Sequence, residues 1–171
     1  PPPALWEALE QAAQFYRKQL KQTPRAIDYL KKRGLTGAIA ARYGIGYAPE
    51  GWSPLKQVFA DYTADALAAS GLVVDGDNRR YDRFRDRIMF PIKNIKGQIV
   101  GFGGRVLDKG EPKYLNSPET PLFHKGSELY GLFEARAAIK AAGRAIVVEG
   151  YMDVVALAQH GVEFAVAALG T

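Results

Sequence analysis

The sequence contains no cysteine and only two histidines, His124 and His160, among its 171 residues. Without cysteine, the chain can form neither a disulfide bond nor a cysteine-ligated zinc site. The two histidines stand far apart in the sequence, so they do not supply a metal site in place of cysteine. This composition is consistent with a reducing, cytoplasmic setting.

Long apolar runs are also missing. No stretch approaches the roughly 18 consecutive apolar residues that a membrane-spanning helix needs, and no signal peptide precedes Leu5. The sequence therefore predicts no membrane partner. The composition, 47% hydrophobic and 24% charged, is that of a folded soluble protein.

Neither a GxGxxG motif nor a Walker lysine–serine pattern occurs, so the sequence has no nucleotide-binding fingerprint of these kinds. Glycine does gather at Gly101, Gly103 and Gly104, inside a segment that otherwise reads as a strand. Such glycines are typical of places where a backbone bends or closely approaches a ligand, and we expect one of these roles here.

Positive charge is concentrated in one segment. The net charge is +5, and the residues from Arg79 to Lys113 include ten Lys or Arg against four Asp or Glu. An anionic partner is therefore expected at this segment. Arg83, Arg85 and Arg87 occupy alternate positions, so in an extended strand all three would face one side of a sheet and bind phosphate groups.

Aromatic residues interleave with these charges. Phe84, Tyr114 and Phe123 lie among the basic residues, where their rings can stack on bases. The alternative is a solvated strand face whose arginines pair with Asp82 and Asp86, with the aromatic rings in the core. The sequence leaves both interpretations open.

A second candidate site follows the apolar run Ala145–Val148, which predicts a strand buried on both faces. Gly150 allows a sharp turn after Glu149, a helix is expected from Tyr151 to His160, and a second strand at 164–169 completes a β-α-β unit. Open α/β sheets bind ligands at the carboxyl ends of their strands, so Glu149 and Asp153 are candidates for holding a divalent cation. Alternatively, Asp153 is only a charge at a helix N-terminus and Glu149 a solvated loop residue.

The remaining pattern predicts an α+β fold in three segments. Residues 1–71 read as a helical layer, with helices at 4–20, 23–33, 36–44, 53 onward and 63–71. Residues 72–143 read as a small, mostly antiparallel basic sheet, with a hairpin around 75–77, strands at 87–92 and 98–102, and a helix at 132–142. Residues 144–171 form a truncated α/β β-α-β unit. A lone parallel strand pair is not a stable sheet, so we interpret the chain as an excerpt of a larger domain.

Five motifs in a fixed order resemble the bacterial DnaG-type DNA primase family. They are Tyr81–Ile92, Gly101–Arg105, Pro112–Thr120, Phe123–Gly126 and Val148–Asp153. The resemblance covers essentially the whole chain and is most specific from Tyr81 onward. It implies the RNA-polymerase core of a primase: a mixed N-terminal subdomain followed by the start of the TOPRIM fold.

The resemblance implies synthesis of short RNA primers on single-stranded DNA during replication, by nucleotidyl transfer that depends on Mg²⁺ or Mn²⁺. Glu149 matches the family's metal ligand or acid/base residue, and Asp153 matches its second catalytic acid. The implied nucleotide and template contacts are Arg83, Arg85, Arg105, Lys113, Asn116 and Lys125. The implied partners are single-stranded DNA template, ribonucleoside triphosphates, an RNA–DNA hybrid and a replicative helicase, at the replication fork in the bacterial cytoplasm.

Three parts of the family pattern are missing from these 171 residues. They are the zinc-binding module, the helicase-binding region, and the downstream TOPRIM aspartates that complete the metal site. Zinc is therefore expected only in the missing module. We expect the 171 residues alone to bind magnesium poorly and to make no primers. Arg105 and Lys113 are expected to be partly exposed, so that their removal weakens binding without unfolding the protein.

Two other functions remain as alternatives. One is another TOPRIM enzyme, a topoisomerase or a nuclease, although a topoisomerase needs a catalytic tyrosine in another domain and Tyr151 lies too close to Glu149. The other is a single-stranded DNA-binding module without chemistry. The basic motifs that precede Glu149 favour the primase.

Overall fold

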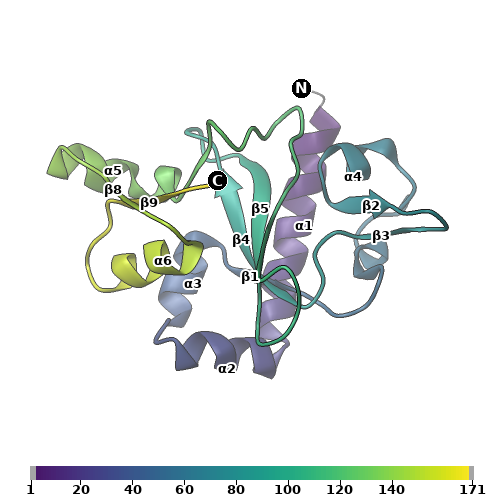
Figure 1. Ribbon diagram of the computed structural model, residues 1–171, viewed down its shortest axis with the longest axis horizontal. Helices are drawn as coiled ribbons and strands as arrows, with labels where there is room; N and C mark the ends of the chain where they lie inside the picture. Colours follow the sequence, from purple (N-terminus) through teal and green to yellow (C-terminus); the bar gives the residue numbers. More distant parts are fainter. Residues whose placement is uncertain (1–2, 170–171) are drawn as a thin grey trace.

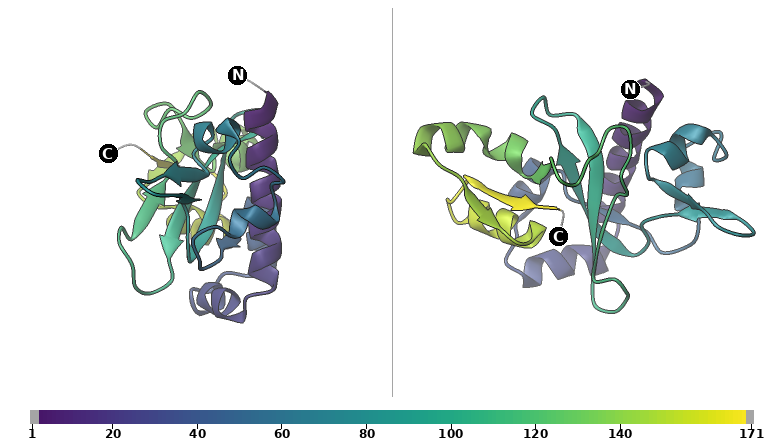
Figure 2. Two further views of the ribbon diagram at one scale, coloured as in Figure 1. Left: turned by 90° about the vertical axis from the view of Figure 1, so that its right-hand side faces the viewer. Right: turned by 45° about the horizontal axis from the view of Figure 1, so that its top comes forward.

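The computed structural model describes residues 3–169. A long helix, α1 (Pro3–Lys21), lies along one face of a four-stranded antiparallel sheet (Figures 1 and 2). The apolar stripe that the helical spacing predicts, Leu5, Leu9, Ala12, Tyr16 and Leu20, is buried against this sheet and the adjoining core. Burial of this stripe, rather than intrinsic helix propensity, is the main source of the helix's stability.

The central sheet has the strand order β1-β4-β5-β6. Its longest pair is β4 (Arg87–Lys93) with β5 (Ile99–Val106), joined by the predicted turn at 94–97 and carrying a register shift at Ile92/Lys93. β6 (Tyr114–Asn116) pairs with β5, and β1 (Gly46–Ala48) pairs with β4. Pro91 lies beyond the residues that β1 reaches, as expected for a residue without a backbone N–H.

Two of the three β5 glycines are explained by packing. Gly101 pairs with Ile92 at the register shift, as expected of a glycine where a strand bends, whereas the strand is regular at Gly103 and Gly104, where side chains occupy the space beside the backbone. A Cβ on Gly103 would overlap the Tyr151 ring, and one on Gly104 would lie 2.9 Å from Phe84 Cδ1. Gly103 and Gly104 therefore allow aromatic side chains to pack directly against the sheet.

Two helices, α2 (Pro24–Lys32) and α3 (Gly37–Tyr43), follow α1 at one end of the sheet (Figure 1). The predicted helix that starts at Thr36 is confirmed, and Thr36 caps it by accepting a hydrogen bond from Ile39 N at 3.2 Å. Thr23 does not cap α2, because its hydroxyl donates to Gln19 O instead. The helix predicted from Ser53 is only a short 3₁₀ turn, η1 (Pro54–Gln57), and the next is α4 (Asp65–Ala69).

A small hairpin pairs β2 (Val73–Asp75) with β3 (Arg80–Asp82) beside α4, as the sequence predicts. At the opposite end of the molecule lie β7 (Leu129–Tyr130), α5 (Leu132–Ala142), β8 (Ile146–Val148), α6 (Tyr151–Gln159) and β9 (Ala165–Ala168) (Figure 1). Their sheet has the order β7-β9-β8, and β8 runs parallel to β9, which confirms the predicted β-α-β unit.

The prediction that β8 is buried on both faces is wrong. Ile146 is 37% exposed and Val147 64% exposed, because β8 pairs only with β9 in the described part of the chain. The central strand β9 is the buried one, with Ala165, Val166 and Ala167 each 1% exposed. An apolar run shows that a strand is suited to burial, but its position in the sheet decides whether it is covered.

Each of the two larger sheets contains strands from more than one of the three predicted segments. β1, from the first segment, pairs with β4 of the second, and β7, from the second, pairs with β9 of the third. One hydrophobic cluster includes side chains from all three. None of the helices in residues 3–169 is long and apolar enough to cross a membrane.

Candidate active site

The carboxylates of Glu149 and Asp153 lie where the sequence places them, directly after β8 and in the first turn of α6. Gly150 stands between them as the N-terminal cap residue of the helix, with extended backbone angles. Both carboxylates are exposed, and both line one cavity of about 690 Å³. The predicted proximity of the two acids at the carboxyl end of a parallel strand is therefore confirmed.

The same cavity receives side chains from the central sheet. Tyr114 and Asn116, both on β6, line it opposite the β8–α6 turn, and Leu169 lies beside them. Asn116 Nδ2 donates to Leu169 O at 3.2 Å, which ties β6 to the end of β9. The cavity thus lies at the junction of the two sheets.

The chemistry of these residues fits a hard divalent cation, because such ions take carboxylate oxygens and retain several waters. Within residues 3–169, neither Glu149 nor Asp153 forms an ion pair, so their oxygens are available. Two carboxylates are nevertheless a partial ligand set. No cluster of three or more His, Cys, Asp or Glu residues suited to a metal occurs in the described part of the chain.

The basic residues between β3 and β4 do not form the predicted extended face. Residues 83–86 belong to no strand, and Asp86 has a positive φ of 51°, which breaks the alternation of side chains. Loop carbonyls hold this segment in place, because Arg83 N donates to Leu72 O and Asp86 N donates to Pro49 O.

Each of the three arginines therefore has its own surroundings. Arg83 donates from Nε and Nη2 to Asn116 O at 3.1 and 2.8 Å, and burial lowers its pKa. Arg85 lies over the rings of Trp52 and Tyr81, 4.5 and 5.0 Å from their centroids. Arg87 is buried and donates to backbone carbonyls of Gly104 and Lys113.

These arginines still share a basic pocket. A cavity of about 370 Å³ is lined by Arg83, Arg85, Arg87 and Lys109, together with the acidic residues Asp86 and Glu111. Arg83 also contacts the backbone of Asn116, which lines the carboxylate cavity. The basic pocket and the carboxylate cavity therefore lie on either side of β6.

Arg105 is not the partly exposed charge that the sequence suggested. It is 8% exposed and donates to the hydroxyls of Tyr29 and Tyr114 and to Val106 O. Lys113 is exposed, just before β6, and Lys125 is partly buried, with its backbone N donating to Glu119. Of these three cations, Lys113 is the one whose charge is freely exposed to solvent.

Two of the three interleaved aromatic residues belong to the core. Phe84 and Phe123 are fully buried, whereas Tyr114 is 42% exposed. A further exposed aromatic residue, Trp52, does not stand out in the sequence: it is 51% exposed and has Arg79 and Arg85 stacked 4.3 and 4.5 Å from its ring centroid. The one sequence signal for Trp52 is a bulky aromatic in a short loop after a glycine, with no apolar neighbours.

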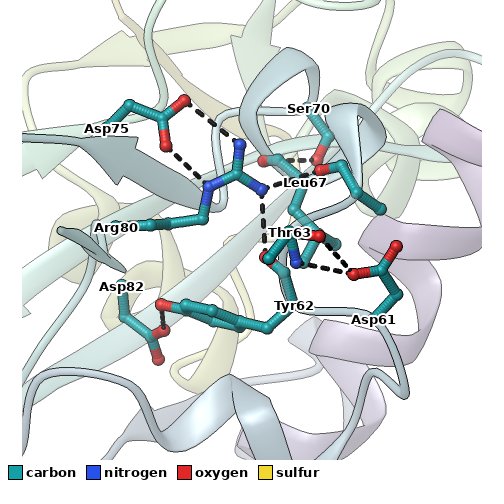
Figure 3. Close-up of polar contacts among 9 residues, drawn as sticks. Asp61, Tyr62, Thr63, Leu67, Ser70, Asp75, Arg80 and Asp82 are labelled. Carbon is teal, nitrogen blue, oxygen red and sulfur yellow. Dashed lines mark hydrogen bonds and ion pairs between the residues drawn. The ribbon is translucent and has the colours of Figure 1, made fainter.

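The acids that the sequence offered as partners of the arginines are engaged elsewhere. Asp86 accepts hydrogen bonds from Arg25 and from the Tyr47 hydroxyl at 2.7 and 2.6 Å. Asp82 is 1% exposed and accepts from the Tyr62 hydroxyl at 2.6 Å (Figure 3). It also accepts from Leu55 N at 3.0 Å. Burial raises the pKa of Asp82 to about 6, although both hydrogen bonds oppose this shift.

An ion pair of Arg80 stabilises the region around Asp82. Arg80 forms a two-point ion pair with Asp75, at 2.6 and 3.1 Å, and donates to the carbonyls of Tyr62 and Ala64 (Figure 3). The β2–β3 hairpin is thereby fixed to the segment that leads into α4. This network stabilises the surface on which Trp52 and Arg85 lie, and it contributes no group to the carboxylate cavity.

Comparison with known proteins identifies the fold and the motifs together. The family model described as "DNA primase catalytic core, N-terminal domain" matches residues 15–136, and the one described as "Toprim domain" matches residues 143–171. A DNA primase from Neisseria meningitidis is 65% identical over 159 residues, covering 93% of this chain and 27% of the relative. A DNA primase from Pseudomonas aeruginosa is 54% identical over 174 residues, covering 98% of this chain and 26% of the relative.

A solved structure agrees with these relatives. The DnaG primase catalytic domain bound to single-stranded DNA superimposes with a TM-score of 0.92 at 49% identity, covering 99% of this chain and 54% of that one. The chain spans about a quarter of the length of the two curated relatives named above. The matches extend over both the central sheet and the β8–α6 turn, and the chain therefore belongs to the family of DNA primase catalytic cores.

Proposed function

We propose that the chain forms the first part of an RNA-polymerase core that synthesises short RNA primers on single-stranded DNA for replication. The observation that carries this proposal is the cavity at the junction of the two sheets, which brings Glu149 and Asp153 together with Asn116. Support also comes from the similar primase domain that was solved with single-stranded DNA.

The proposed chemistry is nucleotidyl transfer, in which a ribose 3′-oxygen attacks the α-phosphate of a nucleotide and pyrophosphate leaves. Glu149 and Asp153 would hold Mg²⁺ or Mn²⁺ through their free carboxylate oxygens. The bound cation would offset the negative charge that develops on the transferred group. Asn116 would contact the nucleotide from the opposite wall of the cavity.

The basic residues are proposed to hold phosphates outside this cavity. Arg83, Arg85, Lys113 and Lys125 are the candidate contacts for triphosphate and template, and Arg105 acts indirectly because it is buried. The proposed partners are single-stranded DNA, ribonucleoside triphosphates and an RNA–DNA hybrid. A replicative helicase would bind outside these residues, and the site of action would be the bacterial cytoplasm.

We further propose three segments, 1–71, 72–143 and 144–171, as the helical layer, the basic part of the N-terminal subdomain and the start of TOPRIM. The 171 residues alone are expected to bind magnesium poorly and to make no primers. The partial ligand set supports this expectation, because no third His, Cys, Asp or Glu joins these two carboxylates in the described part of the chain. Primer synthesis by the isolated 171 residues would contradict it.

The test of the main proposal is the substitution Glu149→Gln. It is made in a longer protein that contains this chain and has the full length of the related primases. The change removes a charge but keeps the size of the side chain. Primer synthesis should fall at least about a hundredfold, while single-stranded DNA binding and the melting temperature stay unchanged. Glu7→Gln, the same change at an exposed position of α1, is the matched control and should retain full activity.

The outcomes separate catalysis from binding. Unchanged synthesis in Glu149→Gln would refute a role for this carboxylate. A parent protein that binds single-stranded DNA but synthesises nothing with any nucleotide would favour the non-catalytic binding module instead. Loss of synthesis together with a lowered melting temperature would assign Glu149 a structural role.

A further inference from the structure

Tyr114 is an exposed aromatic residue beside the carboxylates. It is 42% exposed, whereas Phe84 and Phe123 of the same motifs are fully buried. It lies on β6 and lines the same cavity of about 690 Å³ as Glu149 and Asp153. This volume is within the range of small-molecule sites, and an exposed ring in such a place is a candidate ligand contact.

The hydroxyl end of Tyr114 is held by a buried cation. Arg105 lies directly opposite Tyr114 across the β5–β6 pair and donates from Nε to its hydroxyl at 3.2 Å. The guanidinium is itself fixed by Val106 O at 2.7 Å and by the Tyr29 hydroxyl of α2. Arg105 therefore connects α2 to this ring along one face of the sheet.

The neighbouring ring is that of Tyr151, at the start of α6. The centroids of Tyr114 and Tyr151 lie 6.2 Å apart at an interplanar angle of 56°, and Tyr151 stacks on Phe90 at 5.2 Å. Tyr151 is 4% exposed. The Tyr114 ring is thus supported by rigid neighbours while much of its surface stays open to the cavity.

An open, immobilised ring offers a base a surface to stack on at little cost in side-chain entropy. The geometry also indicates that the stacked base belongs to the incoming nucleotide and not to the template. Tyr114 lines the same cavity as the two carboxylates, so its ring is within reach of the base of a nucleotide whose phosphates lie beside them. Lys113 Nζ, 5.8 Å from the ring centroid, adds positive charge beside this surface.

We propose that Tyr114 is the stacking platform for the base of the ribonucleoside triphosphate bound beside Glu149 and Asp153, and that Arg105 is the residue that positions it. This inference rests on the proposed function. It reassigns Arg105 from a direct phosphate contact to a positioning residue. It also assigns the exposed ring of the Pro112–Thr120 motif a substrate contact.

The test compares Tyr114→Leu with Tyr114→Phe in the full-length primase that contains this chain. Leucine removes the aromatic face, whereas phenylalanine keeps the face and loses only the hydrogen bond from Arg105. The KM for ribonucleoside triphosphates should rise roughly tenfold in Tyr114→Leu and distinctly less in Tyr114→Phe, with kcat and single-stranded DNA affinity unchanged in both. Tyr114→Val, which suits a strand, replaces leucine if thermal melting shows that the leucine variant is unfolded.

Three results would overturn the inference. An unchanged KM in Tyr114→Leu removes the stacking role. Equal KM increases in the leucine and phenylalanine variants show that the hydrogen bond, not the ring, matters. Weaker single-stranded DNA binding at an unchanged KM assigns the ring to the template. None of these results touches the proposed function, which fails only if Glu149→Gln retains activity.

Discussion

Two acidic sites in this molecule have opposite surroundings. Asp82 is 1% exposed and already accepts hydrogen bonds from Tyr62 and Leu55. Glu149 and Asp153 are exposed on a cavity wall and form no ion pair within residues 3–169. A carboxylate whose oxygens are already satisfied stabilises the fold, whereas one with free oxygens is available to a ligand.

Replacing each acid by alanine should give the largest difference between the two sites. Asp82→Ala leaves the Tyr62 hydroxyl and Leu55 N buried without an acceptor, and should lower the free energy of unfolding by about 4 kcal/mol. Asp153→Ala removes an exposed side chain and should change it by less than about 0.5 kcal/mol. Urea unfolding measures both, and equal effects would remove the distinction between the sites.

The pH dependence of stability should come next in size. Because burial raises the pKa of Asp82 to about 6, above its unfolded value, the folded protein binds a proton more tightly there than the unfolded chain does. This contribution is fully present below about pH 4 and is lost as the pH rises through about 6, an effect of up to about 3 kcal/mol.

Asp82→Asn tests the origin of that slope. The amide can keep both contacts, accepting from Leu55 N and donating to the Tyr62 oxygen, but it does not titrate. Unfolding measured between pH 4 and pH 7 should lose this component of the slope, and the variant should be at least as stable as the parent at pH 7. A slope that persists unchanged would assign it to other groups.

Arg105 and Lys113 show the same contrast between a side chain that is hydrogen-bonded within the fold and one that is exposed to solvent. We expect a smaller effect on stability here than at the two acidic sites. Arg105→Ala removes three hydrogen bonds of a buried side chain and should cost about 2 kcal/mol of stability. Lys113→Ala should leave stability unchanged, and should reduce the slope of log K against log salt for single-stranded DNA by roughly 1. Fluorescence anisotropy at several salt concentrations measures this slope. If the Arg105→Ala variant kept the full stability of the parent, Arg105 would be a surface charge and not a structural residue.

The sequence predicted the elements and motifs that depend on local pattern. Periodicity and turn residues predict the α1 stripe, the start of α3 at Thr36, the β2–β3 hairpin and the β8–α6–β9 unit. The proximity of Glu149 and Asp153 was predicted because ligand sites in open α/β sheets lie at the carboxyl ends of the strands. These features need no knowledge of what packs against them.

The features that the sequence did not predict all depend on distant parts of the chain. β1 is too short to show a period, and only its pairing with β4 makes it a strand. Arg83, Arg85 and Arg87 alternate in sequence, but Asp86 is drawn into a positive φ by contacts to Arg25, Tyr47 and Pro49, so the alternation is lost. Arg105 is buried because Tyr29, from α2, lies over it.

The open edge of β8 has a consequence for how the site is held. In the described part of the chain, this strand has a partner on one side only, so backbone amides that point to its other side have no ladder hydrogen bond to slow exchange with deuterated water. Glu149 is the residue that directly follows this strand, which is paired on one side only. Any strand that pairs with the open edge would restrict the Glu149 carboxylate as well, and completing the sheet and ordering this carboxylate would then be one cooperative step.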